Sequence, residues 1–206
     1  MKKIIILLTM VVALVSCTTD ADDEWDAAKV CPESKRGTFV DERDGQVYKY
    51  TTIGEQVWMA ENLRYKSEGS ICFFDDNVCD STGRYYLFDN ALCPAGWHLP
   101  TSDEWLVLVD NVGGADKAAI HLKSESGWRP LNPGDNGNGL DDCAFDMMPS
   151  NRGDKNDGFI SDFLTSTRDS SVSNFIGVVG AASYLDLIEI GSRGLNIFSS
   201  VRCIRD

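Results

Sequence analysis

The segment from residue 126 to residue 142 combines one tryptophan with many oxygen-bearing side chains, a pattern typical of carbohydrate recognition. Sugar rings stack on aromatic faces, and closely spaced oxygen ligands can also coordinate calcium. The spacing does not match the EF-hand pattern, and the segment is saturated with turn-forming residues. A sugar site, with calcium as the candidate cofactor, therefore competes here with a plain polar loop. The candidate ligand-binding residues are Trp128, Asp135, Asn136, Asn138, Asp141 and Asp142.

Side chains suited to catalysis are sparse. Glu61 and Glu104 could act as the two carboxylates of a glycoside hydrolase. However, Thr101 and Glu104 also form a capping-box pattern, which explains Glu104 without catalysis. His98 is better explained as a structural imidazole bonded to the backbone than as a catalytic base. The chain contains no Gly-x-Ser-x-Gly, His-Glu-x-x-His or Gly-x-x-x-x-Gly-Lys motif. We therefore expect a protein that is not an enzyme.

The N-terminus has the features of a bacterial lipoprotein signal. Lys2 and Lys3 precede an apolar run at residues 4–15, which is too short to stay in a bilayer as a spanning helix. The sequence Leu-Val-Ser-Cys at residues 14–17 resembles a lipobox, in which the cysteine sulfur takes a diacylglycerol. Cys17 is thus predicted to become the lipidated, palmitate-bearing N-terminus that anchors the mature protein to a membrane. An ordinary signal peptide with a coincidental cysteine is the alternative.

The remaining cysteines are even in number, as expected for disulfides in an exported chain. Many connectivities are open, but Cys72 and Cys79 lie close enough in sequence to staple a local hairpin. A zinc site is disfavoured because no Cys-x-x-Cys pair occurs and His98 and His121 are far apart. The six candidates for disulfides are Cys31, Cys72, Cys79, Cys93, Cys143 and Cys203.

Composition divides the chain into three parts. Residues 1–16 form the signal peptide, residues 17–35 an acidic flexible tether without apolar periodicity, and residues 36–206 a single domain. The formal net charge of -13 becomes -15 once the two signal lysines are removed. A surface with this much negative charge repels the phosphate backbone of nucleic acid. We therefore exclude nucleic acid as a partner. An acidic cluster after a lipidated cysteine resembles a signal for display on the outer membrane surface, although an acidic spacer alone is also common.

The domain is predicted to be α+β, with short early helices and long irregular loops. A meander of three short strands is expected from residue 37 to residue 63, because Asp44-Gly45 and Gly54-Glu55 separate β-branched and aromatic runs. A helix should begin after Thr101 and end at Gly113-Gly114. Further expectations are helical pieces at 83–91 and 115–123, a loop at 126–142, and mostly antiparallel strands at 145–148, 159–167, 174–190 and 198–204.

Three segments carry a family likeness in the expected order. They are residues 56–65 (Gln-Val-Trp-Met-Ala-Glu-Asn-Leu-Arg-Tyr), residues 93–105 (Cys-Pro-Ala-Gly-Trp-His-Leu-Pro-Thr-Ser-Asp-Glu-Trp) and residues 200–206 (Ser-Val-Arg-Cys-Ile-Arg-Asp). Together they resemble the Fibrobacter succinogenes major paralogous domain, a module of secreted and lipidated bacterial proteins, over residues 36–206. That family has no settled biochemical activity, so the resemblance implies no reaction.

A more distant resemblance concerns the fold. Residues 97–105 and 201–205 are similar to segments of formylglycine-generating-enzyme-like domains, which have a C-type-lectin-like fold. The likeness implies that N- and C-terminal strands pair, that a long loop region forms the ligand face, and that Cys93 bonds to Cys203. Closing so long a loop would contribute roughly 4 to 5 kcal/mol in the chain-entropy model. Cys31 and Cys143 are then left as a pair by elimination.

The chain also departs from these reference groups. It has no counterpart of the paired active-site cysteines of the formylglycine-generating enzymes, and it lacks the Glu-Pro-Asn, Gln-Pro-Asp and Trp-Asn-Asp triplets of calcium-dependent lectins. Residues 152–154 read Arg-Gly-Asp, which a polar turn explains better than integrin binding.

From these features we expect an exported, lipid-anchored, non-catalytic binding or adhesion module that recognises polysaccharide. Its place is the bacterial cell envelope, at the outer membrane and displayed on the surface, with the periplasmic face as the other possibility. The alternative function is a structural or envelope-assembly lipoprotein whose partner is another protein.

Overall fold

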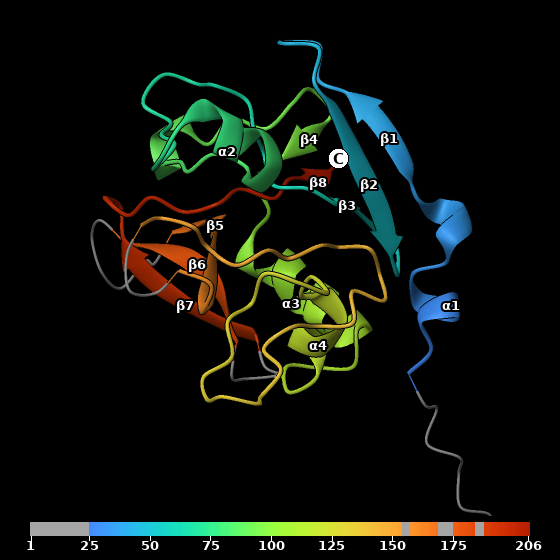
Figure 1. Cartoon of the computed structure of the whole chain (residues 1–206). Helices are drawn as coiled ribbons and strands as arrows, with labels where there is room; N and C mark the ends of the chain where they lie inside the picture. The colour runs from blue at the N-terminus through green and yellow to red at the C-terminus, as the bar shows by residue number, and fades with distance from the viewer. Residues whose placement is uncertain (1–24, 154–156, 169–174, 184–187) are drawn as a thin grey trace, which may run out of the picture.

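The computed structural model describes residues 25–153, 157–168, 175–183 and 188–206, and within them it shows an α+β domain (Figure 1). The helical elements are α1 (Ala27–Val30), η1 (Glu33–Lys35), α2 (Asp76–Thr82), η2 (Phe88–Asn90), α3 (Ser102–Asn111) and α4 (Ala118–Leu122). The strands are β1 (Gly37–Val40), β2 (Val47–Ile53), β3 (Gln56–Met59), β4 (Trp97–His98), β5 (Ile160–Arg168), β6 (Phe175–Ala182), β7 (Ile188–Gly194) and β8 (Ile204–Arg205).

These strands form two antiparallel sheets. A 5-stranded sheet has the order β1-β2-β3-β8-β4, and a 3-stranded sheet has the order β5-β6-β7. The predicted meander is confirmed as β1, β2 and β3, with turns at Gly45 (φ 76°) and Gly54 (φ 59°), where the left-handed backbone favours glycine. The implied pairing of N- and C-terminal strands is also found, since Trp58 of β3 lies opposite Ile204 of β8.

The helix predicted after Thr101 is confirmed as α3. The Glu104 backbone N–H donates to the Thr101 hydroxyl at 3.1 Å, and the Thr101 backbone N–H donates to the Glu104 carboxylate at 2.7 Å. This reciprocal capping box satisfies donors that the first turn of a helix leaves free. The helix then buries Trp105 and Leu108 in the core. The helical piece predicted at residues 115–123 is confirmed as the shorter α4.

Replacing Thr101 with alanine is expected to destabilise the domain by about 1 kcal/mol, because the capping hydroxyl is lost while the helix stays in place. Denaturant unfolding of the purified protein measures the change. Thr101→Ser keeps a capping hydroxyl and should remain close to the wild type. Equal unfolding midpoints for both variants and the wild type would contradict the role of the cap.

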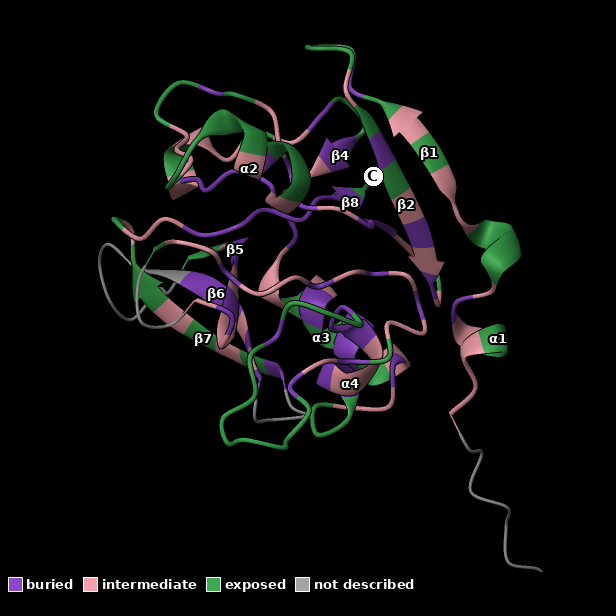
Figure 2. Cartoon of the chain, in the orientation of Figure 1, coloured by how far each residue is buried: buried purple, intermediate pink, exposed green. Residues whose placement is uncertain are grey.

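The buried residues, purple in Figure 2, include two hydrophobic clusters, and both β3 and β5 contribute side chains to each of them. Successive residues of a strand point to opposite faces. Accordingly Trp58 and Met59 in β3, and Phe163 and Leu164 in β5, are fully buried but belong to different clusters. One cluster contains the inner faces of α3 and α4, which lie between the two sheets in Figure 1. Strands β1 and β7 instead alternate more buried residues with exposed ones over most of their length, because one side of each strand meets solvent.

The helix predicted at residues 83–91 is wrong. Gly83, with a φ of 84°, ends the preceding helix α2, whose start is capped by the Asp75 carboxylate. Beyond Gly83, Tyr85 and Tyr86 each form a β-bridge with a distant segment, and only the short turn η2 follows. Tertiary pairing thus overrides the local helical pattern.

The strand predicted at residues 145–148 is also wrong. Only Met147 forms a bridge there, because the carbonyl oxygens of Phe145 and Asp146 accept hydrogen bonds from the Arg202 guanidinium instead of from a neighbouring strand. The predicted strand at 159–167 is confirmed as β5. The strand expected at 174–190 divides into β6 and the start of β7, and the one at 198–204 shrinks to β8.

The cysteines of the described residues form three disulfides: Cys31–Cys143, Cys72–Cys79 and Cys93–Cys203. The pairing implied by the resemblance and the pairing left by elimination are both present. The local pair differs in one respect, because it joins a loop to α2 and not the two arms of a hairpin.

The end of the predicted tether is part of the folded domain. Residues 25–35 include α1 and η1, and Cys31 is covalently tied to Cys143. The Trp25 indole N–H donates to the Asn111 carbonyl at 2.9 Å, and its ring lies 3.7 Å from the His121 ring. The predicted signal, Cys17 and the acidic cluster lie outside the described residues. Within the described ranges, no helix has the length and apolarity that crossing a membrane requires.

Candidate functional site

The structure does not gather the six predicted ligand-binding residues into one site. Trp128 is only 4% exposed, and its indole N–H donates to the Ser124 hydroxyl and the Met147 carbonyl, each at 3.1 Å. A buried ring offers no face on which a sugar could stack. The predicted stacking role of Trp128 is therefore wrong, and this tryptophan is a core residue.

Three other predicted residues use their oxygens inside their own loop. The Asp135 carboxylate accepts from the Asn132 amide at 2.8 Å, and the Asn136 side chain accepts from the Asn138 backbone N–H at 3.1 Å. The Asn138 side chain accepts from the Trp128 backbone N–H at 3.0 Å. In the described ranges, no group of three or more His, Cys, Asp or Glu side chains is placed to hold a metal ion.

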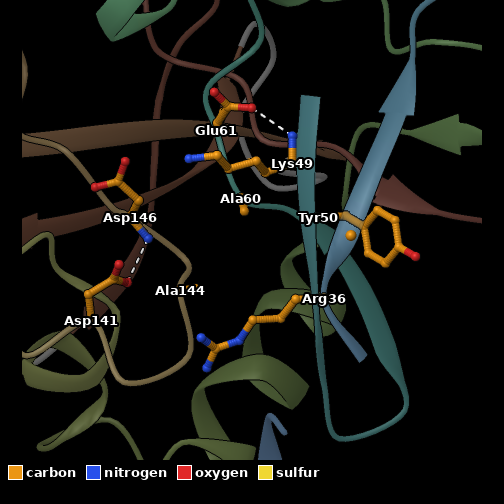
Figure 3. Close-up of a pocket in the computed structure, with 9 residues that line it drawn as sticks. Arg36, Lys49, Tyr50, Ala60, Glu61, Asp141, Ala144 and Asp146 are labelled. Atoms are coloured by element: carbon orange, nitrogen blue, oxygen red, sulfur yellow. Dashed lines mark hydrogen bonds between the residues drawn. The ribbon is translucent and has the colours of Figure 1, made fainter. Parts of the chain in front are cut away.

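Asp141 is the predicted residue that lines a pocket rich in charge, which we call the Asp141 pocket (Figure 3). It has a volume of about 230 Å³ and lies between β2, the end of β3 and the loop of residues 141–146. Asp142 points elsewhere, because its carboxylate bonds to the His121 ring at 2.7 Å. The pocket is lined by Arg36, Gly37, Lys49, Tyr50, Ala60, Glu61, Asp141, Ala144 and Asp146.

One wall of the Asp141 pocket is strained backbone. Asp141, Ala144 and Asp146 have φ values of 48°, 50° and 51°, and they are the non-glycine residues with positive φ in the part of the chain that the structure describes. Each such residue costs about 1 to 3 kcal/mol and persists only where its surroundings impose it. Here the imposing contacts are the disulfide of Cys143 and the hydrogen bonds from Arg202. Strain of this kind collects at ligand-binding sites.

The opposite wall brings in charges from distant segments. The Arg36 guanidinium donates to the carbonyls of Cys31 and Asp142 at 3.2 and 2.8 Å, which fixes it beside the pocket. The Glu61 carboxylate accepts from the Lys49 backbone N–H at 2.6 Å. Figure 3 shows the Lys49 side chain extending from β2 toward the loop that carries Asp146. This wall therefore carries two cations, Arg36 and Lys49, together with the Glu61 carboxylate, and it faces the loop that carries Asp141 and Asp146.

Burial raises the pKa of Asp141 to about 6, and the nearby Asp146 charge acts in the same direction. The backbone N–H of Asp146, which donates to the Asp141 carboxylate at 2.7 Å, and the positive charge of Arg202 oppose the shift. Asp141 therefore changes its charge close to neutral pH, and the charge of the pocket changes with it.

Asp141→Asn is expected to alter the pH dependence of stability. The native state keeps a proton on Asp141 up to a pH of about 6, whereas an unperturbed aspartate loses it near 3.8, so stability falls as pH rises through this window. In the variant, the free energy of unfolding should depend less on pH in this window, and at pH 7 it should exceed that of the wild type by on the order of 2 kcal/mol. Asparagine also tolerates the left-handed backbone of this position.

Unfolding in denaturant at a series of pH values from about 4 to about 7, which covers the window between the two pKa values, checks this expectation. Asp116→Asn, at an exposed position without a hydrogen bond or ion pair in the described residues, is the matched control. Parallel curves for Asp141→Asn and the wild type would contradict the assignment.

The other candidate catalytic groups are occupied by structural contacts. Glu61 lines the Asp141 pocket but Glu104 does not. The two carboxylates considered for glycoside hydrolysis therefore do not share this site. The His98 ring bonds to Glu104 at 2.9 Å and to Asp206 at 2.7 Å, and not to the backbone as expected. Partial burial by itself would lower the pKa of His98, but the hydrogen bonds and negative charges of these two carboxylates outweigh it, so the pKa of His98 is raised. In the Arg-Gly-Asp segment, Asp154 lies outside the described residues.

Sequence reasoning missed Arg36, Lys49 and Asp146 as members of a site. These residues are far apart in sequence and meet only because the Cys31–Cys143 disulfide holds the loop against the start of β1 and against β2. The available signal was weak: several aspartates surround Cys143, and aspartate tolerates left-handed backbone better than most residues.

Comparison with known proteins gives one match. The sequence profile of the Fibrobacter succinogenes major domain matches residues 51–205. This range contains all three motif segments except Asp206, the last residue of the third segment. β1 and Arg36 precede this range, yet they complete the first sheet and the Asp141 pocket. No curated protein and no solved structure gives a significant match.

Proposed function

Given that this chain belongs to the Fibrobacter succinogenes major domain family, we propose that it functions as an exported, lipid-anchored, non-catalytic binding module that recognises polysaccharide. Lipidation of Cys17 would hold the domain at the bacterial envelope, on the outer membrane and exposed at the surface. The Asp141 pocket is the proposed binding site.

The observation that carries the proposal is the strained, charged wall of the Asp141 pocket. A loop that keeps Asp141, Ala144 and Asp146 in the left-handed region lowers stability, and the disulfide of Cys143 holds it there. Such an arrangement places carboxylates and cations at fixed positions before a ligand arrives, which reduces the entropy lost on binding. Carboxylates and ammonium groups are also suitable partners for sugar hydroxyls.

Two further considerations support binding over catalysis. Glu104 and His98, which could otherwise act as acid or base, are joined to each other and to structural partners. The C-type-lectin-like likeness of residues 97–105 and 201–205 also favours a fold whose irregular loops carry ligands. The Asp141 pocket includes the end of such a loop.

A glycan array probed with the full mature chain, with and without calcium, tests the sugar proposal. We expect binding to a subset of glycans, and weaker binding of the same glycans by Asp146→Asn, which keeps a residue that tolerates the left-handed backbone. Asp116→Asn serves as the control. If no glycan on the array is bound either with or without calcium, the polysaccharide proposal is wrong.

The lipid anchor has a separate test. Metabolic labelling of intact bacteria with palmitate should mark the wild type and leave Cys17→Ser unlabelled. Protease added to the same cells then distinguishes display on the outer surface, where the domain is cut, from a periplasmic position, where it is protected. Equal labelling of both proteins would contradict lipidation at Cys17.

A second candidate function is assembly with another envelope protein. Phe73 and Phe74 are 39% and 55% exposed, and the Cys72–Cys79 disulfide ties the loop that carries them to α2. Exposed aromatic side chains are enriched at protein interfaces. Cross-linking in intact cells followed by affinity purification should then recover a stoichiometric partner, which a Phe73→Ser/Phe74→Ser variant would lose.

A further inference from the structure

Three charged residues that line the Asp141 pocket, Arg36, Lys49 and Asp146, form no ion pair in the part of the chain that the structure describes. Arg36 donates to two backbone carbonyls but forms no ion pair with a carboxylate in the described residues. The Lys49 ammonium group and the Asp146 carboxylate likewise have no hydrogen-bonding or ionic partner there, although both line the same cavity. A ligand with complementary charges can therefore bind without first breaking an internal ion pair.

Arg36 also contains an unsatisfied donor. Its Nε is buried without a hydrogen-bond partner, while one terminal nitrogen is held by the carbonyls of Cys31 and Asp142. A guanidinium held in this way presents donors in a fixed plane, which suits recognition of a carboxylate. Lys49 supplies a second cation on the neighbouring strand β2.

The anionic side of the pocket has the opposite preference. Asp146 and Glu61 line it together with Asp141, and only Glu61 is paired with a cation, the Arg64 guanidinium at 3.1 Å. Carboxylates that face a cavity attract an ammonium group. The pocket thus offers unpaired partners for both a negative and a positive group of one ligand.

Pocket size limits the ligand further. The volume of about 230 Å³ is below the range of about 300 to 1,000 Å³ that is typical of drug-sized ligands. It fits one sugar unit and not a long segment of chain.

We propose that the Asp141 pocket selects a single sugar unit that carries both a carboxylate and a free ammonium group. Arg36 and Lys49 bind the carboxylate, and Asp146 binds the ammonium group. This inference rests on the proposed function and adds the class of sugar to it. Neutral sugars, and sugars with only one of the two charges, bind more weakly because the two cations, or the Asp146 carboxylate, or all three then have no charged partner on the ligand.

Calorimetric titration of the full mature chain at neutral pH tests the inference. The probe is muramic acid, an amino sugar that bears a carboxylate. N-acetylmuramic acid lacks the ammonium group, glucosamine lacks the carboxylate, and alanine has both charges without the sugar. We expect muramic acid to bind at least about tenfold more tightly than the other three, as expected for loss of one charge-assisted hydrogen bond.

Two variants locate the binding. Lys49→Gln and Asp146→Asn each remove one charge and should each weaken muramic acid binding by about tenfold. Lys117→Gln and Asp116→Asn are matched exposed controls outside the pocket and should bind as the wild type does. Retained binding in Lys49→Gln and Asp146→Asn would overturn the assignment to this pocket.

The outcomes separate this inference from the proposed function. Binding of neutral glycans on the array without binding of muramic acid would overturn the inference and leave the polysaccharide proposal intact. Alanine that binds as tightly as muramic acid would overturn the sugar requirement, because the paired charges would then suffice. A silent array together with tight muramic acid binding, lost in both pocket variants, would support the inference while removing recognition of longer glycans.

Discussion

Replacing Arg202 with methionine is expected to lower the free energy of unfolding by about 4 kcal/mol, since several buried acceptors lose their donor together. The guanidinium is fully buried and donates to the carbonyls of Met59, Phe145 and Asp146 and to the Asn62 side chain. Each unsatisfied buried acceptor costs about 1 to 3 kcal/mol, and relief of the desolvated charge offsets part of the sum. Burial lowers the pKa of Arg202 to about 10, so the side chain still carries its charge at neutral pH.

Denaturant unfolding of purified protein measures this loss. Arg205→Met is the matched control, because Arg205 is exposed and its guanidinium lies over the rings of Tyr50 and Trp97 at 4.5 and 4.8 Å. Arg205→Met should lower the free energy of unfolding by no more than about 1 kcal/mol. Arg202→Lys keeps the charge but not the planar set of donors, and it should fall between the two. Wild-type stability of Arg202→Met would show that the carbonyls find other donors.

Removing the Cys93–Cys203 disulfide is expected to have a second large effect. Its cysteines are separated by 110 positions, so the bond restricts a large part of the unfolded chain. In the chain-entropy model, replacing both cysteines with alanine lowers stability by about 5 kcal/mol. The loss should appear as a lower unfolding midpoint and a lower melting temperature, with the other disulfides intact.

The Cys72–Cys79 disulfide provides the comparison, since its cysteines are only 7 positions apart. The same model assigns about 2.5 kcal/mol to replacing both of these cysteines with alanine. An equal loss for the two double variants would contradict the entropic account. Non-reducing digestion with mass spectrometry confirms in each case which disulfides remain.

Local rules predicted the elements whose signals lie in adjacent residues. The reciprocal contacts of Thr101 and Glu104 follow from their spacing, and the turns at Gly45 and Gly54 follow from the backbone that they require. The α+β class and the three-strand meander came from the same kind of pattern, whereas the pairing of N- and C-terminal strands was implied only by the family resemblance.

Elements and site residues that depend on distant contacts could not be predicted in this way. The expected strand at residues 145–148 is prevented by Arg202, which approaches from the far end of the sequence. Trp128 suited a sugar site by composition, but burial decided its role. The charges of the Asp141 pocket meet only through the Cys31–Cys143 disulfide, whose effect on the backbone is not visible in residue spacing.

The attachment of Trp25 to α3 and α4 limits how far the domain can stand from a membrane. If Cys17 carries lipid, the connecting chain from Cys17 to Trp25 spans at most roughly 29 Å even when fully extended. The Asp141 pocket includes Arg36, which follows Trp25 closely in the chain. With lipid at Cys17, this short connection would keep the domain and its pocket close to the bilayer, and inserting residues between Cys17 and Trp25 would let the pocket reach farther from the membrane without altering its lining.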